Sequence, residues 1–138
     1  MPIKNYTTKI NALQSIGEIQ CSLAAHGARK VMIDYDTAGN PTGIAFAIQT
    51  ENGAIGYQLP ANVEGVKAAL KRDGAKCDEA QAKNIAWRNI RDWVLAQMAF
   101  IDAGNVQMDE VFLPYRVIAQ TKQTVYEAIK SGQFLLGE

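Results

Sequence analysis

Three segments between residues 28 and 60 alternate apolar and polar residues, and this pattern constrains the fold more than any other feature of the sequence. The apolar positions are Val31, Ile33 and Tyr35, then Ile44, Phe46 and Ile48, and finally Ile55, Tyr57 and Leu59. Apolar residues at every second position are typical of strands with one buried face. The links AGNPTG and ENG contain the Asn and Gly residues that tight hairpin turns favour. The segments therefore predict an antiparallel meander with one apolar face.

Two further features concern this sheet. Its other face carries the small residues Ala45, Ala47 and Gly56. Without large side chains, this part of the surface can admit close packing or a ligand. Residues 6–10 also alternate, with Tyr6 and Ile10 among the larger side chains, which predicts a short fourth strand at an edge. We therefore expect three or four antiparallel strands.

The segment SIGEIQCSLAAHG predicts a first helix. Ser15 and Glu18 have the spacing of a capping box, and Gly27 supplies a left-handed stop. Between them an apolar stripe at helical spacing is formed by Ile16, Ile19, Leu23 and Ala24. His26 is expected to interact with the carbonyl groups at the C-terminal end of this helix.

A longer helix is predicted between Asp78, which can cap its start, and Gly104, which ends it. Shorter helices are expected after Asn62 and in QTVYEAIKSG. The chain is thus expected to form a single α+β domain over residues 1–138, with the N-terminal helix and the long C-terminal helix packed on one face of the sheet. Six residues are expected in its core: Leu23, Ile33, Phe46, Ile48, Ile90 and Val94. Because the long helix exceeds the needs of so small a domain, we expect a homo-oligomer with this helix near the interface.

Composition excludes several classes of function. Lysine and arginine number 14, as do aspartate and glutamate, so the formal net charge is zero, which disfavours nucleic acid and gives no attraction to a membrane. Cys21 and Cys77 lie far apart in the sequence, and the chain has one histidine. These residues match no common zinc-binding arrangement, so the two cysteines are predicted to be free thiols. Asp34 and Asp36 are interpreted as a solvated strand end rather than a cation site. No signal peptide or spanning segment is recognised, so we expect a protein of the host-cell cytoplasm without metal or cofactor.

The stretch AWRNIRDWVLAQMAFIDAG has two interpretations. The simpler is a core helix with solvated arginines on its flank. The alternative is a ligand face, because guanidinium groups beside aromatic rings suit planar anionic ligands. The segment FLPYRV repeats the combination of aromatic and basic residues. If that segment lies against the long helix, a ligand site is expected at Trp87, Arg88, Arg91, Tyr115 and Arg116. Catalytic motifs such as GxSxG and HExxH are absent from the sequence, so we expect no enzyme.

The order of YTTKI, IGEIQ, GARKVMIDYD, IAFAI, LPANVEGV, AWRNIRDWVLAQ and EVFLPY resembles a family of small proteins encoded by bacteriophages and prophages. The pieces AWR, DWVxAQ and FLPY are its most specific parts. The resemblance implies a phage setting and no enzyme activity. By analogy with Thoeris anti-defence sponges, which bind cyclic ADP-ribose derivatives, we expect a binding protein that sequesters a nucleotide-like signalling molecule. Two alternatives stay open, a nucleic-acid-binding accessory of phage replication or recombination and a protein-binding inhibitor of a host factor.

Overall fold

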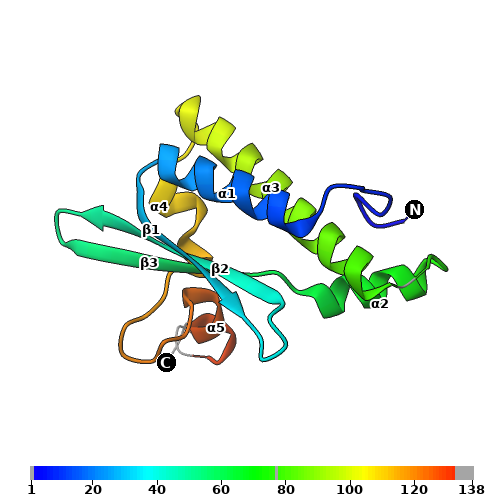
Figure 1. Ribbon diagram of the computed structural model, residues 1–138. Coiled ribbons are helices and arrows are strands. Elements are labelled where there is room, and N and C mark those ends of the chain that lie inside the picture. Colours follow the sequence, from blue (N-terminus) through cyan, green and yellow to red (C-terminus); the bar gives the residue numbers. More distant parts are fainter. Residues whose placement is uncertain (1, 77, 133–138) are drawn as a thin grey trace.

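The computed structural model describes residues 2–76 and 78–132 and has an antiparallel sheet with its main helices on one face (Figure 1). The elements in chain order are α1 (Ala12–Ala25), β1 (Ala28–Tyr35), β2 (Pro41–Thr50), β3 (Gly53–Pro60), α2 (Val63–Arg72), α3 (Glu79–Asp102), α4 (Met108–Val111), the 3₁₀ helix η1 (Leu113–Tyr115) and α5 (Val125–Lys130). Helices α1 and α3 lie side by side above the sheet, whereas α5 lies below it (Figure 1). The α+β fold expected from the sequence is confirmed.

The sheet has three strands in the order β1-β2-β3. Ile44 pairs with Ile33 of β1 and Leu59 of β3, so these apolar positions share one face, as the alternation predicted. Tyr35 is the exception, because it lies beyond a break in the register and is 60 % exposed. Beyond β3, the chain after η1 returns to the sheet, and the amide of Val117 donates to the carbonyl of Gly56 at 2.8 Å. This segment covers the outer edge of β3.

The fourth strand predicted over residues 6–10 is wrong, because this part of the chain forms turns and an irregular segment. Asn5 has a left-handed backbone with φ 67°. Its side-chain amide donates to Asn89 at 2.8 Å and to Asp92 at 2.9 Å, both on α3. The amide of Gln81 donates to two carbonyls of the segment, at 3.1 and 2.9 Å. Polar side chains of α3 therefore replace the hydrogen bonds that a sheet edge would have supplied.

The start of α1 also differs from the prediction. Asn11 caps the helix, and its side chain accepts from the amide of Gln14 at 2.9 Å. Ser15 lies one turn inside the helix and is fully buried, so it is not the cap. Glu18 pairs with arginines of α3 instead of closing a capping box. The predicted stop at Gly27 is confirmed by its φ of 103°.

The other helix boundaries follow the sequence signals. Asp78 caps α3 by accepting from the amides of Ala80 and Gln81, and Gly104 follows its end with φ 82°. Asn62 and Thr124 cap α2 and α5 through their side chains. At 1.5 Å per residue, the 24 residues of α3 span about 36 Å. Within residues 2–76 and 78–132, no helix is both long and apolar enough to cross a membrane.

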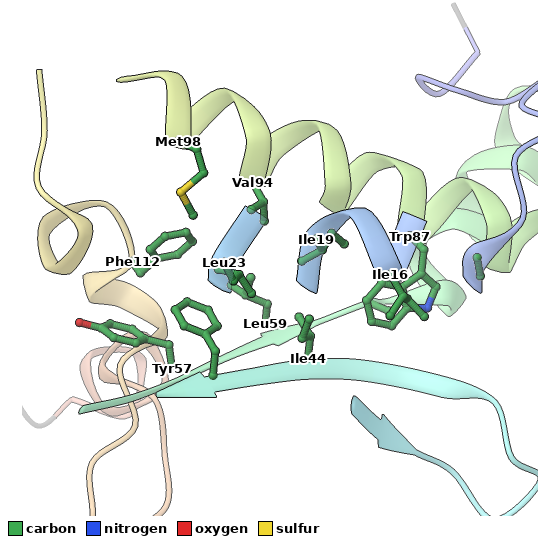
Figure 2. Close-up of a cluster of buried hydrophobic side chains, with 13 residues drawn as sticks. Ile16, Ile19, Leu23, Ile44, Tyr57, Leu59, Trp87, Val94, Met98 and Phe112 are labelled. Atoms are coloured by element: carbon green, nitrogen blue, oxygen red, sulfur yellow. The ribbon is translucent and has the colours of Figure 1, made fainter. Parts of the chain in front are cut away.

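The core lies between the sheet and the helix pair α1 and α3 (Figure 2). Of the six residues predicted to be buried, Leu23, Phe46 and Val94 are at most 3 % exposed. The other three, Ile33, Ile48 and Ile90, are only partly buried and pack against the margin of this core. A second, smaller cluster lies between α2 and α3. The sheet and the pair α1 and α3 thus form two layers, with the main core between them.

His26 links the end of α1 to the end of α3. Its Nδ1 donates to the carbonyl of Ser22 at 2.8 Å, which confirms the contact with the helix end, and its Nε2 lies 2.9 Å from a carboxylate oxygen of Asp102. The hydrogen bond to Ser22, together with the hydrogen bond and charge of Asp102, raises the pKa of His26 above its ordinary value, although partial burial opposes the shift.

A group with a raised pKa in the folded protein stabilises it at low pH, and this contribution disappears as the pH rises through the folded pKa. We therefore expect His26→Gln to lower the free energy of unfolding at both pH values, and by about 0.5–1 kcal/mol more at pH 5.5 than at pH 8.5. Urea unfolding of both proteins at the two pH values measures this difference. An equal difference at both pH values would contradict the assignment of a protonated His26.

Candidate functional site

Trp87 is part of the core and not of the surface. Its side chain is fully buried, and it lies among the apolar residues between α3 and the sheet (Figure 2). The indole Nε1 donates to the carbonyl of Pro41 at the start of β2, at 3.2 Å. Because no face of the ring is open, Trp87 cannot stack on a ligand in this structure.

Arg88 and Arg91 face α1. The Nε of Arg91 donates to Glu18 at 2.7 Å, and Nη1 of Arg88 donates to the same carboxylate oxygen at 3.3 Å. Arg91 also contacts Asp92 at 3.0 Å. Hydrogen bonds from Gln14 and Arg91 hold the pKa of Glu18 below its ordinary value, so its carboxylate stays ionised at neutral pH. The arginines are thus neither simply solvated nor open to a ligand, and they join α1 to α3.

Tyr115 and Arg116 lie on another side of α3. The ring of Tyr115 meets the ring of Trp93 edge to face, with centroids 5.8 Å apart and planes at 72°. Arg116 has an exposed side chain and continues into the segment that covers β3. At about 100° per residue, Trp93 lies about 140° around α3 from Arg88. The structure therefore brings Tyr115 to α3 as the sequence analysis expected, but not to Trp87, Arg88 or Arg91.

A groove of about 520 Å³ lies where Trp93 and Tyr115 meet, and we call it the Trp93 groove. It is bordered by the N-terminal segment, the end of β3, the start of α2, the middle of α3 and η1. Its lining includes Ile3, Leu59, Pro60, Asn62, Gly65, Val66, Asn89, Ile90, Trp93 and Tyr115. Trp93 remains 37 % exposed there, so part of its ring is accessible.

The polar side chains of the Trp93 groove include two amides held by internal hydrogen bonds. The Oδ1 of Asn62 accepts from the amide of Gly65 at 3.2 Å, and the Oδ1 of Asn89 accepts from Asn5 at 2.8 Å. Among the described residues, neither amide nitrogen has a hydrogen-bond acceptor, so both remain available as donors. A Cβ on Gly65 would come within 2.5 Å of the Asn62 side chain, so a larger residue at position 65 would require this side chain to shift.

Sequence reasoning missed Trp93, Asn62 and Asn89 as site residues. Trp93 belongs to the stretch AWRNIRDWVLAQMAFIDAG but is not among the predicted ligand residues, and Asn62 is predicted only to precede a short helix. Asn89 and Trp93 are four residues apart and share a helix face, which is a signal present in the sequence. That the same face would meet Tyr115 depends on the path of residues 105–115, which local patterns do not determine.

The residues considered for metal or thiol chemistry have other surroundings. The carboxylate of Asp36 accepts from the amides of Ala38 and Asn40 at 3.0 and 2.9 Å and so holds the hairpin turn. No group of three metal-binding side chains is found in residues 2–76 and 78–132. Cys21 is a free, exposed thiol, and Cys77 lies outside the described residues.

The chain was compared with protein-family models, with curated proteins and with solved structures. No family model matches it, and neither comparison with known proteins finds a significant match. The resemblance to a phage-encoded family therefore stays a prediction, and the account of function depends on the site itself.

Proposed function

We propose that this protein is a non-enzymatic binding protein that holds a nucleotide-like small molecule in the Trp93 groove. The observation that carries the proposal is the meeting of Trp93 and Tyr115 in one accessible groove. Stacking of a base on an aromatic ring contributes about 1–3 kcal/mol, and it tolerates any base because every base has a π face. A volume of about 520 Å³ is also in the range of small-molecule sites.

The amides of Asn62 and Asn89 suit the edge of a planar heterocycle. An amide donates and accepts hydrogen bonds, as base edges do, and it does not titrate near neutral pH. Hydrogen bonding without proton transfer favours retention of a ligand over its chemical conversion. This chemistry supports a binder without turnover.

Two exposed cations are sequence neighbours of residues that line the Trp93 groove. Lys4 follows Ile3, and Arg116 follows Tyr115, and both of these neighbours line the groove. The ammonium of Lys4 is 3.3 Å from Asp92, with 68 % of its side chain exposed, so a phosphate can compete for it. We assign these two side chains, rather than Arg88 and Arg91, to the phosphate groups of the ligand. In the phage setting that the resemblance implies, such a protein would sequester a nucleotide signal of the host and so act as a counter-defence sponge.

Calorimetry tests the proposal against cyclic mono-, di- and trinucleotides, cyclic ADP-ribose isomers and single-stranded DNA. We expect one nucleotide class to bind with micromolar or lower Kd and to be released intact after denaturation. Trp93→Ala should weaken this binding by about 5- to 150-fold, which corresponds to the loss of one stacking contact. Arg88→Ala, on the far side of α3, is the matched control and should leave Kd unchanged.

Equal affinity of wild type and Trp93→Ala would show that the ligand binds elsewhere. A hydrolysed product would show a catalyst. Binding of DNA alone, with strong dependence on salt, would favour the nucleic-acid accessory.

A protein partner is the second candidate, and a specific surface favours it. Trp93 and Phe100 are seven residues apart on one side of α3, and they are 37 % and 51 % exposed. Leu113 of η1 is 48 % exposed. Exposed aromatic residues are enriched in protein interfaces. No binding of any nucleotide, together with unchanged stability of Phe100→Ala, would make the inhibitor of a host protein the better account.

A further inference from the structure

Strand β1 is an edge of the sheet that no described residue covers. The opposite edge, on β3, is covered by Arg116 and Val117. The register of β1 with β2 is regular from Lys30 to Asp34 and is interrupted on either side of this stretch. An unpaired strand edge presents backbone donors and acceptors to another chain, and proteins usually block such edges.

We propose that the outer edge of β1 binds a second copy of this chain, in an antiparallel pairing centred on Met32. The two three-stranded sheets would then form one six-stranded sheet around a two-fold axis. Such an axis brings the same surface of both copies together, so the strand must be complementary to itself. The sequence of β1 meets this requirement on both of its faces.

On the α5 side of the sheet, the pairing places Lys30 of each copy opposite Asp34 of the other. Lys30 is exposed, and Asp34 is partly exposed, with a long contact of 3.4 Å between its carboxylate and the side-chain amide of Gln58. Opposite charges directly across antiparallel strands stabilise the pair. A register shifted by two residues would put one of these charges opposite Met32, and a parallel pair would put Lys30 beside Lys30. Charge therefore favours this single register.

On the face that carries the core, the pairing places Val31 opposite Ile33. Both side chains are only partly buried in the single chain and pack at the margin of the core. Pairs of β-branched residues across strands suit the pleated surface of a sheet, and their contact would extend the core across the two-fold axis. Met32, which is 63 % exposed, would meet its own copy at the centre of the pairing on the α5 side of the sheet.

Helix α1 packs against β1, so the two copies of α1 would also approach each other in the proposed pairing. One side of α1 carries residues at spacings of four, three and four, and they are Leu13, Gly17, Gln20 and Ala24. Leu13 is 74 % exposed, and a Cβ on Gly17 would meet nothing within 4 Å. The two small residues on this side, Gly17 and Ala24, would allow the two copies of α1 to come close above the joined sheets. The interface differs from the one expected from the sequence, which was placed on the long helix.

Two charge reversals test the register. Lys30→Asp puts two acidic residues opposite each other at both ends of the pair, and Asp34→Lys puts two basic residues there. Light scattering of wild type at micromolar concentration should give a mass near 30 kDa, twice the 15.1 kDa of one chain. Each single variant should dimerise roughly tenfold to a hundredfold more weakly, because two cross-strand ion pairs become repulsive.

Mixing the two single variants is the experiment that tests the proposed register most directly. In a mixed pair every acidic residue faces a basic one, so the mixture should regain the dimer mass, as should the double variant Lys30→Asp with Asp34→Lys. Circular dichroism of each variant establishes that it is folded. A monomeric wild type would overturn the proposal, and so would single variants that dimerise as well as wild type or a mixture that stays monomeric.

Discussion

Trp87→Ala is expected to lower the free energy of unfolding by about 3–5 kcal/mol. The ring is fully buried between α3 and the sheet, so its removal leaves a large cavity. The change also removes the indole N–H that donates to the carbonyl of Pro41. A buried carbonyl without a donor costs about 1–3 kcal/mol, and this cost is included in the total of about 3–5 kcal/mol given above. Such a loss is a large fraction of the stability of a domain of this size.

Urea unfolding, followed by far-ultraviolet circular dichroism, measures this effect. Trp87→Phe separates its two parts, since the smaller ring retains most of the packing but cannot donate to Pro41. Trp93→Ala is the matched control, because that ring is 37 % exposed and lines the groove rather than the core. Similar destabilisation by Trp87→Ala and Trp93→Ala would contradict the different roles assigned to the two tryptophans.

Phe112→Ala is expected to have a comparable cost of about 3–5 kcal/mol. Phe112 is fully buried, and its ring lies 5.2 Å from Phe46, 6.1 Å from Tyr57 and 5.6 Å from Trp93, as measured between centroids. It is the anchor that holds the chain after α3 against the sheet (Figure 2). Aromatic contacts of this kind add about 0.5–1.5 kcal/mol each beyond the burial of area.

The same substitution should also weaken the binding of a nucleotide. Tyr115 lies three residues after Phe112, so loss of the anchor releases the ring that meets Trp93. Leu113→Ala is the control, because Leu113 is 48 % exposed and should change stability by less than about 0.5 kcal/mol. Urea unfolding and calorimetry of the three proteins measure both effects. Equal stability of the Phe112 and Leu113 variants would show that the segment is not held through Phe112.

Much of the fold follows from local signals. The period-two pattern of residues 28–60 predicted the three strands, and Asp78 and Gly104 predicted the extent of α3. The predictions failed where contacts between residues distant in sequence determine the local structure. Residues 6–10 alternate as a strand would, but the turn at Asn5 and the amide of Gln81 bind them to α3. Such partners are separated by more than 70 residues and leave no local pattern.

The site was predicted less well than the fold. Trp87 is buried in the core, which agrees with the interpretation of this stretch as a core helix and not with a ligand face at Trp87. Arg88 and Arg91 resembled an anion site only because Glu18, on another helix, could not be assigned to them. The signal for the proposed groove is the pair of Asn89 and Trp93 at helical spacing, and the contact of Trp93 with Tyr115 depends on residues distant in sequence.

Single-tryptophan fluorescence tests the central claim, that the ligand stacks on Trp93. The chain has two tryptophans, so Trp87→Phe leaves Trp93 as the only indole, and Trp93→Phe leaves only Trp87. Each protein is titrated with the nucleotide that binds most tightly in calorimetry. We predict that the emission of Trp93 is quenched with saturation at the calorimetric Kd, whereas the emission of Trp87 is unchanged. Nucleotide binding that leaves the emission of Trp93 unaltered would contradict the account.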